Sequence, residues 1–336
     1  MDTLTHALSG ALLARATQSK DLPPRSAPRR IAAAFFACAA PDLDIVFSLL
    51  GPVRYLELHR GPTHSLLLLP FWALLFSWIL AKILREPRGW KALYGVAAMG
   101  IALHIAGDLI TSFGTMIFWP VSDMRPGLGS TFIIDPWFSG IILAGLLFSI
   151  FIPNSRIPSV AASMALCAYV GFGEIQHLKA LDFARDYARG RGMPQAKVAA
   201  HPRAVSPFNW TVFVSTERDH HFAHVNLARI APRDLAPGDG FFTRLDAAFL
   251  PLSMARWQTR SRYGDTATGK EAWDSPAFAF MRWFSDQPAL DATTASPECY
   301  WFLDLRFANP GRDWIPFQFG ACRDSPGAPW RAAEKN

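Results

Sequence analysis

Hydrophobic residues are concentrated in the first half of this chain, where long uncharged runs alternate with short polar stretches. Ser65–Leu84 is a run of twenty residues whose single charge, Lys82, lies near its end. At 1.5 Å per residue, a helix of that length crosses a hydrocarbon core of roughly 30 Å. The run therefore predicts a transmembrane helix.

Three further runs are apolar enough to span a membrane, and a shorter apolar run precedes them all. The spanning runs are Ala92–Phe118, Trp137–Ile152 and Ile157–Gly173, and the shorter helix candidate is Thr3–Ala16.

A sixth apolar segment, Ile31–Leu50, contains Asp42 and Asp44 directly after Pro41. Proline lacks the backbone donor of a helix interior and disfavours helical geometry at the residue before it, here Ala40. We therefore expect this element to be broken at Pro41.

The second half instead shows short alternating patterns that are typical of strands. Its predicted elements are strands at Trp210–Thr216, His220–Leu227, Tyr300–Phe307 and Trp314–Phe319, and one helix near Lys270–Ser285. The predicted fold is an α-helical membrane domain of about five to six apolar helices, residues 1–176, followed by a small extramembrane α+β domain, residues 177–336.

Basic residues set the expected orientation of the spans. They cluster in Arg15–Arg30, in Lys82–Lys91 and at Arg156, and short loops rich in Lys and Arg face the cytoplasm. The loops Gly51–Pro62 and Thr115–Asp135 then lie on the other side. The C-terminal domain is accordingly predicted to be extracytoplasmic.

Composition agrees with a membrane protein and argues against a nucleic-acid partner. The chain has 336 residues, 51% hydrophobic and 18% charged, whereas soluble domains carry about 25% charged residues. Its net charge of +6 is divided evenly, with 13 basic against 10 acidic residues in 1–176 and 20 against 17 in the rest. No basic block is left to follow a phosphate backbone.

Seven ionisable residues lie in or beside the apolar segments of the first half. Such groups cost several kcal/mol at depth unless they are paired or bind an ion, so they indicate a functional site. They are His6, Asp42, Asp44, His59, His64, His104 and Asp108. With the basic loops in the cytoplasm, all seven can meet at a similar depth toward the extracytoplasmic leaflet.

Their chemistry points to a transition metal. His104 and Asp108 are four residues apart, so they share one helix face within reach of one ion. Imidazole with carboxylate suits Zn²⁺, with Mn²⁺ and Fe²⁺ as alternatives. Seven candidates exceed the three protein ligands of a catalytic zinc, which leaves partners that orient the histidines or a second ion. The sequence has no HExxH motif, which disfavours a zincin.

Plainer interpretations remain for each residue alone. His6 could be a satisfied core histidine, and Asp42 or Asp44 could cap a helix after Pro41. His104 and Asp108 could form a proton relay, as in transporters. All seven together favour the metal site, because mutual pairing without an ion would leave surplus negative charge.

Four ordered motifs carry a resemblance to a known family. They are Met1–Gly10 (MDTLTHALSG), Pro41–Asp44 (PDLD), His59–Ser65 (HRGPTHS) and His104–Thr115 (HIAGDLITSFGT). Together they resemble the YdjM-like membrane-bound metal-dependent hydrolases of bacteria, over about residues 1–176. The resemblance implies an integral protein of the bacterial cytoplasmic (inner) membrane, and it strengthens all seven residues as candidate ligands.

The expected mechanism is hydrolysis by metal-activated water. His59, His64, His104 and Asp108 are the preferred ligands, completed by Asp42 or Asp44, and the aspartate left over would be the general base. Arg60 could offset charge building in the transition state, or it could anchor a lipid headgroup.

A site at this depth favours an amphiphilic substrate, such as a membrane lipid or a phosphoester. Two other classes of protein compete with the hydrolase. An ion- or proton-coupled transporter, or a metal-binding membrane protein without hydrolytic activity, could use the same groups. An envelope-binding module with a structural metal is disfavoured by the lack of cysteine near the candidate ligands. The sequence does not fix the oligomeric state.

Cys299 and Cys322 flank the hairpin predicted from Tyr300–Phe307 and Trp314–Phe319. Neighbouring strands would place them close enough for a disulfide, and two unpaired thiols are the alternative. Cys38 and Cys167 lie in apolar segments and are expected to stay reduced.

Overall fold

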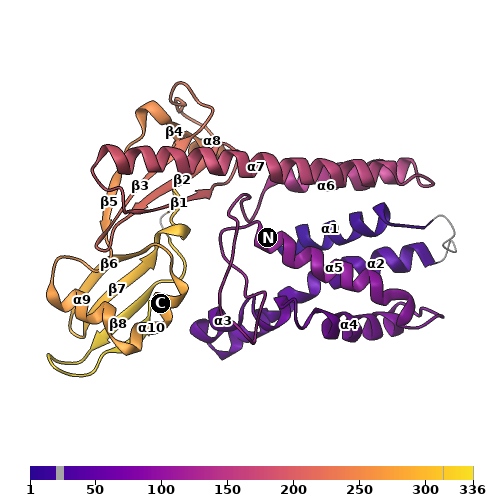
Figure 1. Cartoon of the computed structure of the whole chain (residues 1–336), viewed down its shortest axis with the longest axis horizontal. Helices are drawn as coiled ribbons and strands as arrows, with labels where there is room; N and C mark the ends of the chain where they lie inside the picture. The colour runs from indigo at the N-terminus through magenta and orange to yellow at the C-terminus, as the bar shows by residue number, and fades with distance from the viewer. Residues whose placement is uncertain (20–25, 313, 336) are drawn as a thin grey trace. The chain divides into compact units, whose positions relative to one another are not determined.

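Two units follow one another along the chain in the computed structural model, Met1–Ile175 and Gln176–Asn336. The structure describes residues 1–19, 26–312 and 314–335. The first unit is helical and the second contains two β-sheets (Figure 1). One long helix, α7 (Ile157–Gly190), begins in the first unit and ends in the second.

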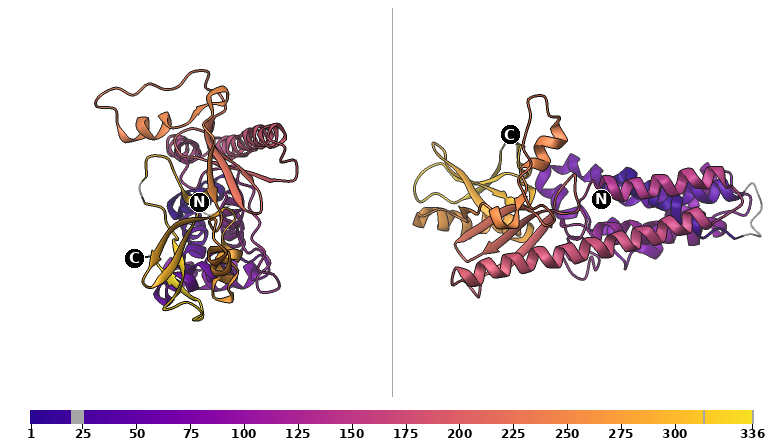
Figure 2. Two further views of the ribbon diagram at one scale, coloured as in Figure 1. Left: turned by 90° about the vertical axis from the view of Figure 1, so that its left-hand side faces the viewer. Right: turned by 90° about the horizontal axis from the view of Figure 1, so that it is seen from above.

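The first unit is a bundle with α2 and α5 at its centre, because each of them contacts α1, α4 and the other. The bundle helices run alongside one another in two of the views (Figures 1 and 2). In chain order its elements are α1 (Thr3–Ala16), α2 (Ser26–Ala39), η1 (Ala40–Leu50), α3 (Pro52–Leu58), η2 (Pro62–His64), α4 (Leu69–Ile83), α5 (Lys91–Leu109) and α6 (Pro136–Phe151).

Small residues let the three inner helices approach closely. A side chain at Gly10 of α1 would collide with the backbone carbonyl of Ala34 in α2. One at Gly100 of α5 would lie 3.1 Å from the same carbonyl oxygen. Ala34 is fully buried between them, as is common where membrane helices pack through small side chains.

The predicted break at Pro41 is confirmed. α2 ends at Ala39 and the chain continues as the 3₁₀ helix η1, in which Pro41 occupies the first turn. The break turns Asp42 and Asp44 out of the regular α-helical repeat, so that both reach the end of the bundle where α3 lies.

The number of candidate spans is smaller than the five to six helices expected. Among the described residues, three helices are long and apolar enough to cross a membrane: Ser26–Leu50, Lys91–Leu109 and Ile157–Gly190. A fourth span forms if Pro52–His64 and Leu69–Ile83, which bend by 82°, count as one. α6 has 16 residues and spans about 24 Å, and α1 is shorter still, so neither meets the length of a full crossing.

The basic loops gather at the end of the bundle opposite α3 and the N-terminus, as Figure 1 shows. Arg15 donates to the carbonyls of Ser149 and Pro153, both at 2.9 Å, and Arg29 donates to that of Leu84 at 3.1 Å. Residues 20–25 of the Arg15–Arg30 stretch lie outside the described residues. The predicted common face of these loops is therefore present, while the side of the membrane stays a prediction.

The second unit begins with a five-stranded sheet against which α7 packs. Ala180, Ala184 and Ala188 of α7 share a core with Val212 and Val214 of β2. The strands are β1 (Lys197–Pro202), β2 (Asn209–Ser215), β3 (Asp219–Asn226), β4 (Leu250–Pro251) and β5 (Gln258–Ser261). β2 and β3 confirm the strands predicted at Trp210–Thr216 and His220–Leu227, and α8 (Phe241–Ala247) lies between β3 and β4.

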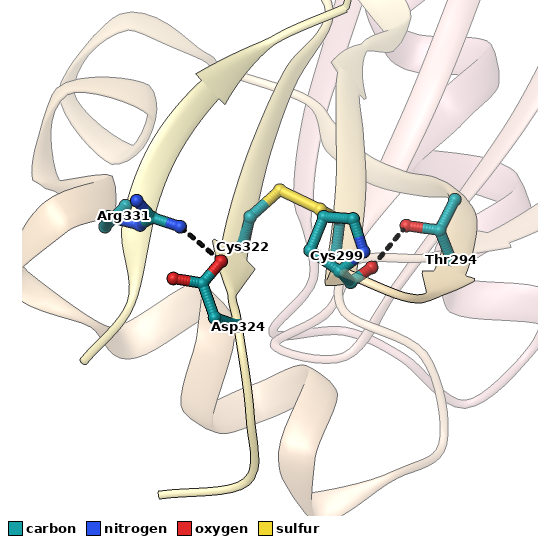
Figure 3. The surroundings of a disulfide bond; sticks show 6 residues. Thr294, Cys299, Cys322, Asp324 and Arg331 are labelled. Atoms are coloured by element: carbon teal, nitrogen blue, oxygen red, sulfur yellow. Dashed lines mark hydrogen bonds and ion pairs between the residues drawn. A yellow bond between two sulfur atoms is a disulfide. The ribbon is translucent and has the colours of Figure 1, made fainter. Parts of the chain in front are cut away.

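A four-stranded antiparallel sheet follows, and it contains a disulfide. Its strands are β6 (Pro288–Ala295), β7 (Glu298–Asp304), β8 (Phe319–Arg323) and β9 (Arg331–Glu334). Cys299 and Cys322 are direct partners in the register of β7 and β8 and are joined by a disulfide (Figure 3). Of the two alternatives for Cys299 and Cys322, the disulfide is therefore the one present. The hairpin differs from the prediction, because β8 begins at Phe319, where the Trp314–Phe319 strand was expected to end.

The prediction of a single helix near Lys270–Ser285 is wrong. The segment forms α9 (Ala267–Asp274) and α10 (Ala279–Phe284), separated by a 3₁₀ turn at Pro276–Phe278. Pro276 cannot donate an α-helical hydrogen bond, and Ser275 before it is extended with ψ 145°.

Candidate metal centre

Four of the seven predicted residues meet at the end of the bundle near α3. Asp42 comes from η1, His64 from η2, and His104 and Asp108 from α5. One ligand atom from each lies within 4.8 Å of the other three. We call these four residues the His/Asp cluster. All but Asp42 are completely buried.

His104 is held in one tautomer by the break after α2. Its Nδ1 lies 2.6 Å from the backbone carbonyl of Cys38, which can only accept, so Nδ1 carries the proton. In the neutral ring, Nε2 then carries the lone pair and directs it into the cluster. Such an arrangement is typical of a ligating histidine oriented by its other ring nitrogen.

His64 is fixed in the same way through a side chain. Thr63 Oγ1 donates to Asp44 Oδ2 at 3.3 Å and lies 2.9 Å from His64 Nδ1, so its lone pair accepts from that nitrogen. The His64 Nε2 atom then also presents a lone pair. It lies 2.9 Å from His104 Nε2. Two lone pairs facing each other at this distance repel, and a cation bound by both nitrogens removes the repulsion.

The two carboxylate oxygens of Asp108 have different surroundings. Oδ1 lies 2.5 Å from the Met1 amino group, 2.9 Å from the Arg60 guanidinium and 3.1 Å from His6 Nε2. Oδ2 is buried and has no hydrogen-bond partner among the described residues. It lies 3.1 Å from His64 Nε2 and 3.5 Å from His104 Nε2. Oδ2 is thus an unsatisfied anionic oxygen aimed at the two imidazoles.

Asp42 closes the cluster on its less buried side. Its Oδ1 lies 3.5 Å from His104 Nε2 and 3.9 Å from His64 Nε2. Thr3 of α1 donates to the other oxygen, Oδ2, at 2.6 Å. The hydroxyl leaves Oδ1 free to face the imidazoles.

These distances fit one transition-metal ion. Four ligands placed about 2.0–2.2 Å from a zinc ion lie about 3.3–3.6 Å from one another. The five separations given above, between the two Nε2 atoms and from them to the carboxylate oxygens, run from 2.9 to 3.9 Å. The cluster can therefore hold a metal ion with little movement of its side chains.

His59 and Asp44 lie beside the cluster and bind each other. His59 Nδ1 and Asp44 Oδ1 are 2.9 Å apart. Asp44 Oδ2 also accepts from the Arg60 backbone N–H at 3.0 Å, in addition to Thr63. His59 was expected among the preferred ligands and Asp44 as a ligand or base. The structure places both outside the four-residue group, with Asp44 bracing the loop that carries His64.

His6, the remaining predicted ligand, is stacked on His104 with ring centroids 3.7 Å apart. Its Nε2 bonds Asp108 Oδ1, the oxygen turned away from the cluster. His6 therefore positions two cluster residues at once from α1.

Arg60 is buried, with a left-handed backbone (φ 58°). Its NH2 pairs with Asp108, and its NH1 donates to Thr111 Oγ1 at 3.1 Å. The guanidinium also lies 4.9 Å from the ring centre of Phe113. The predicted cation beside the ligands is therefore present and is held on three sides.

Two supporting residues were missed by sequence reasoning. Thr63 and Thr111 sit inside the motifs that supplied the histidines, one position before His64 and three after Asp108. A hydroxyl next to a candidate ligand is a usable signal, because it can fix an imidazole or a guanidinium. The Cys38 carbonyl gives no such signal.

Within the described part of the second unit, the histidines form no group comparable to the His/Asp cluster. His220 bonds Ser215, His221 bonds Thr259 and His224 bonds Thr211, so each of these three is paired with a hydroxyl. These contacts give the three histidines a structural role.

The fold and the cluster define a membrane protein built on apolar helices, with a buried His/Asp group able to bind a metal ion at one end of the bundle. The family described as YdjM inner membrane protein matches residues 1–180, and this chain belongs to that family. The resemblance read from the four motifs is confirmed, and the family's description agrees with the apolar helices. It names no activity.

One curated relative is the uncharacterized protein YfhP of Bacillus subtilis (strain 168). It is 28% identical over 140 residues, which are 41% of this chain and 42% of the relative. The chain thus spans less than half the length of this relative. No solved structure matches the chain significantly.

Proposed function

We propose that this protein is a membrane-bound metal-dependent hydrolase that acts at the membrane surface. The observation that carries the proposal is the pair of unprotonated Nε2 atoms of His64 and His104, 2.9 Å apart, beside the unsatisfied Oδ2 of Asp108. This group is buried and preorganised, and its ligand atoms face one another as the donors of one metal ion would. The compact arrangement of four ligand atoms within 4.8 Å of one another favours a metal ion over a proton relay, which needs only one donor and one acceptor at a time.

The preferred ion is zinc, with manganese or iron as alternatives, and one ion is bound. Two imidazoles and two carboxylates suit these metals, and the compact spacing of the cluster leaves room for one. When bound, such a metal supplies Lewis acidity, which polarises the bond to be cleaved and makes water a nucleophile at neutral pH.

His59 is the proposed general base. Asp44 fixes Nδ1 as the donor nitrogen, so Nε2 is available to accept a proton, as in other carboxylate–imidazole pairs. This role replaces the one expected for Asp44, whose two oxygens are already occupied. Arg60 keeps its proposed role of offsetting negative charge that builds on the substrate.

The test is metal analysis of full-length protein purified in detergent, combined with a screen of phosphodiester and carboxylic ester substrates. We expect about one transition-metal ion per chain, and hydrolysis that a chelator abolishes and the metal restores. Protein without metal would contradict the site. A bound metal with no hydrolysis of any substrate would contradict the enzyme and leave a metal-binding or transport protein.

A further inference from the structure

A pocket of about 720 Å³ opens beside the His/Asp cluster, between α2 with η1 on one side and α4 on the other. We call it the α2–α4 pocket. Its apolar lining includes Phe36 and Leu43 on the first side and Phe76, Ile79 and Ile83 on α4. A volume of this size suits a drug-sized or lipid-sized ligand.

The polar residues that line this pocket come from the start of α1, from η1 and from α3 with the two residues after it, which are the segments beside the cluster. They are Asp2, Thr3, Asp42, Tyr55, His59 and Arg60. The α4 residues that line the rest are spaced i, i+3, i+7 and so form one helix face about 10 Å long. The pocket therefore has the polarity of an amphiphile, with a polar end at the metal centre and an apolar channel leading away.

The channel is open along its apolar side. Phe36 is 51% exposed, Leu43 61% and Ile83 68%, although all three line the pocket. In a helical unit of a membrane protein, side chains of this kind border lipid rather than water. A lipid chain can thus pass between the bilayer and the pocket sideways.

Arg60 supplies a specific contact at the polar end. Its side chain is only 3% exposed, yet its Nε is buried without a hydrogen-bond partner in the described part of the chain. The other two guanidinium nitrogens are occupied by Thr111 and Asp108. A buried, unpaired N–H on a cation is a strong donor to an anionic oxygen such as that of a phosphate.

We propose that the α2–α4 pocket binds one acyl chain of a membrane phospholipid, with the lipid's phosphate at Arg60 and its polar end at the His/Asp cluster. The chemistry at that end rests on the proposed function, whereas the binding of the chain does not. A water-soluble substrate would leave the apolar channel unused, and a neutral lipid would leave the Arg60 Nε unpaired.

The experiment uses full-length protein in phosphatidylglycerol vesicles that contain a trace of phosphatidylglycerol with a diazirine in its acyl chain. After irradiation, labelled peptides are identified by mass spectrometry. We expect label on the peptides that contain Phe36–Leu43 and Phe76–Ile83, well above that on the exposed faces of α6 and α7. A diacylglycerol probe with the same chain but no phosphate should label these peptides several-fold less.

Ile79→Trp fills the channel and should reduce this labelling roughly tenfold. Leu74→Trp is the matched control, because Leu74 is exposed on the same helix and does not line the pocket. Both variants should keep their metal content and their elution volume in size exclusion, which shows that the fold is intact.

Three results would overturn the proposal. One is equal labelling of Ile79→Trp and wild type, and another is label spread evenly over the lipid-facing helices. The third is equal labelling by the diacylglycerol probe, which would remove the phosphate contact. The hydrolase proposal fails separately: pocket labelling without hydrolysis supports the binding site alone, and hydrolysis of soluble esters without pocket labelling supports the enzyme alone.

Discussion

Asp108 illustrates how one carboxylate serves two purposes at the candidate metal centre. Three donors from separate segments, the Met1 amino group, His6 and Arg60, converge on Oδ1 and stabilise the buried charge. Oδ2 is left to face His64 and His104. Burial of a charge is tolerable only when it is paired in this way, so the surroundings of Oδ1 explain how Oδ2 can remain unpaired.

Removing a cluster residue should therefore release the metal. We expect His104→Ala and Asp108→Ala to purify with less than about a tenth of the wild-type metal, because each takes away one ligand atom of a small site. Metal content is measured by mass spectrometry of the purified, membrane-extracted protein. His221→Ala is the control, since that histidine bonds Thr259 far along the sequence from the cluster. Full occupancy in both cluster variants would exclude this site.

The same measurement of metal content should distinguish His59 from the cluster ligands. His59→Gln is expected to keep its metal while the rate constant for hydrolysis falls by roughly 10²–10⁴-fold, the usual effect of losing a general base. The dependence of rate on pH should lose the limb that reports this base. Loss of metal from His59→Gln would instead make His59 a ligand, as its spacing in the sequence suggests.

Spacing along the sequence could predict the cluster residues, but it could not predict that the His59 side chain lies outside the cluster. His104 and Asp108 share a helix face, and Pro41 marks the break that frees Asp42, so these followed from periodicity and proline chemistry. His59 and His64 are separated by Arg60, whose left-handed backbone reverses the chain. A left-handed arginine has no signature in the sequence, so the two histidines could not be told apart.

At the scale of elements, close contact of α1, α2 and α5 brings together the segments that carry the site. α1 supplies His6, α2 leads into Asp42, and α5 supplies His104 and Asp108. The helices approach closely because Gly10 and Gly100 leave space for the Ala34 carbonyl.

Adding one methyl group at that contact should be destabilising. In Gly10→Ala the new Cβ would meet the Ala34 backbone, which cannot move aside without shifting α2, so we expect unfolding free energy to fall by about 1–3 kcal/mol. Gly95→Ala on α5 has open space around it and should be neutral or slightly stabilising. Thermal unfolding in detergent, followed by tryptophan fluorescence, compares the two. A Gly10→Ala protein as stable as Gly95→Ala would contradict this packing.

The disulfide between β7 and β8 should stabilise the second sheet. The two cysteines are 23 residues apart, and closing a loop of this size contributes roughly 3 kcal/mol in the chain-entropy estimate. Alkylation of denatured, unreduced protein should modify Cys38 and Cys167 but neither Cys299 nor Cys322, as read by mass spectrometry. Modification of all four would show that the bridge does not form in the cell, and would weaken the extracytoplasmic placement with it.

Element boundaries were the least predictable part of the fold. The strands β2 and β3 were recognisable because both are short runs rich in β-branched and aromatic residues, although β2 is buried along almost its whole length rather than on one face. The segment before β8 is as apolar as a strand, yet its described residues 314–318 are not assigned to a strand, since strand formation is decided by long-range packing. Helix lengths in the first unit were overestimated, because an apolar run can continue past the last helical residue. The run predicted to end at Phe118 does so, since α5 ends at Leu109.

At the scale of the molecule, the His/Asp cluster comes from η1, η2 and the C-terminal part of α5, whereas the basic loops join the other ends of the bundle helices. In Figure 1, α3 and these loops lie at opposite ends of the helical unit. Short basic loops are retained in the cytoplasm, so the cluster should lie toward the outer face of the membrane. In this orientation, the cluster would be accessible to lipids of the outer leaflet and to metal ions outside the cytoplasm.

Reporter fusions test this orientation. We expect a fusion after Arg88 to report a cytoplasmic position, and fusions after Gly61 and Arg203 to report extracytoplasmic ones. The observation behind this is the contact of the three basic loops at one end of the bundle. A cytoplasmic signal at Arg203 would contradict the predicted extracytoplasmic position of the second unit.

The His6–Asp108 hydrogen bond joins residues 102 positions apart, and it has a consequence for biosynthesis. At 5–20 residues per second, a ribosome needs about 5–20 s to add the chain between them. Throughout that interval the aspartates and histidines of η1 and η2 are already in or near the bilayer without their partners from α5. The His/Asp cluster can be completed only late in insertion. A chain arrested before α5 would therefore hold Asp42 and His64 near the bilayer without their partners from α5, and such chains are suitable targets for membrane quality-control proteases.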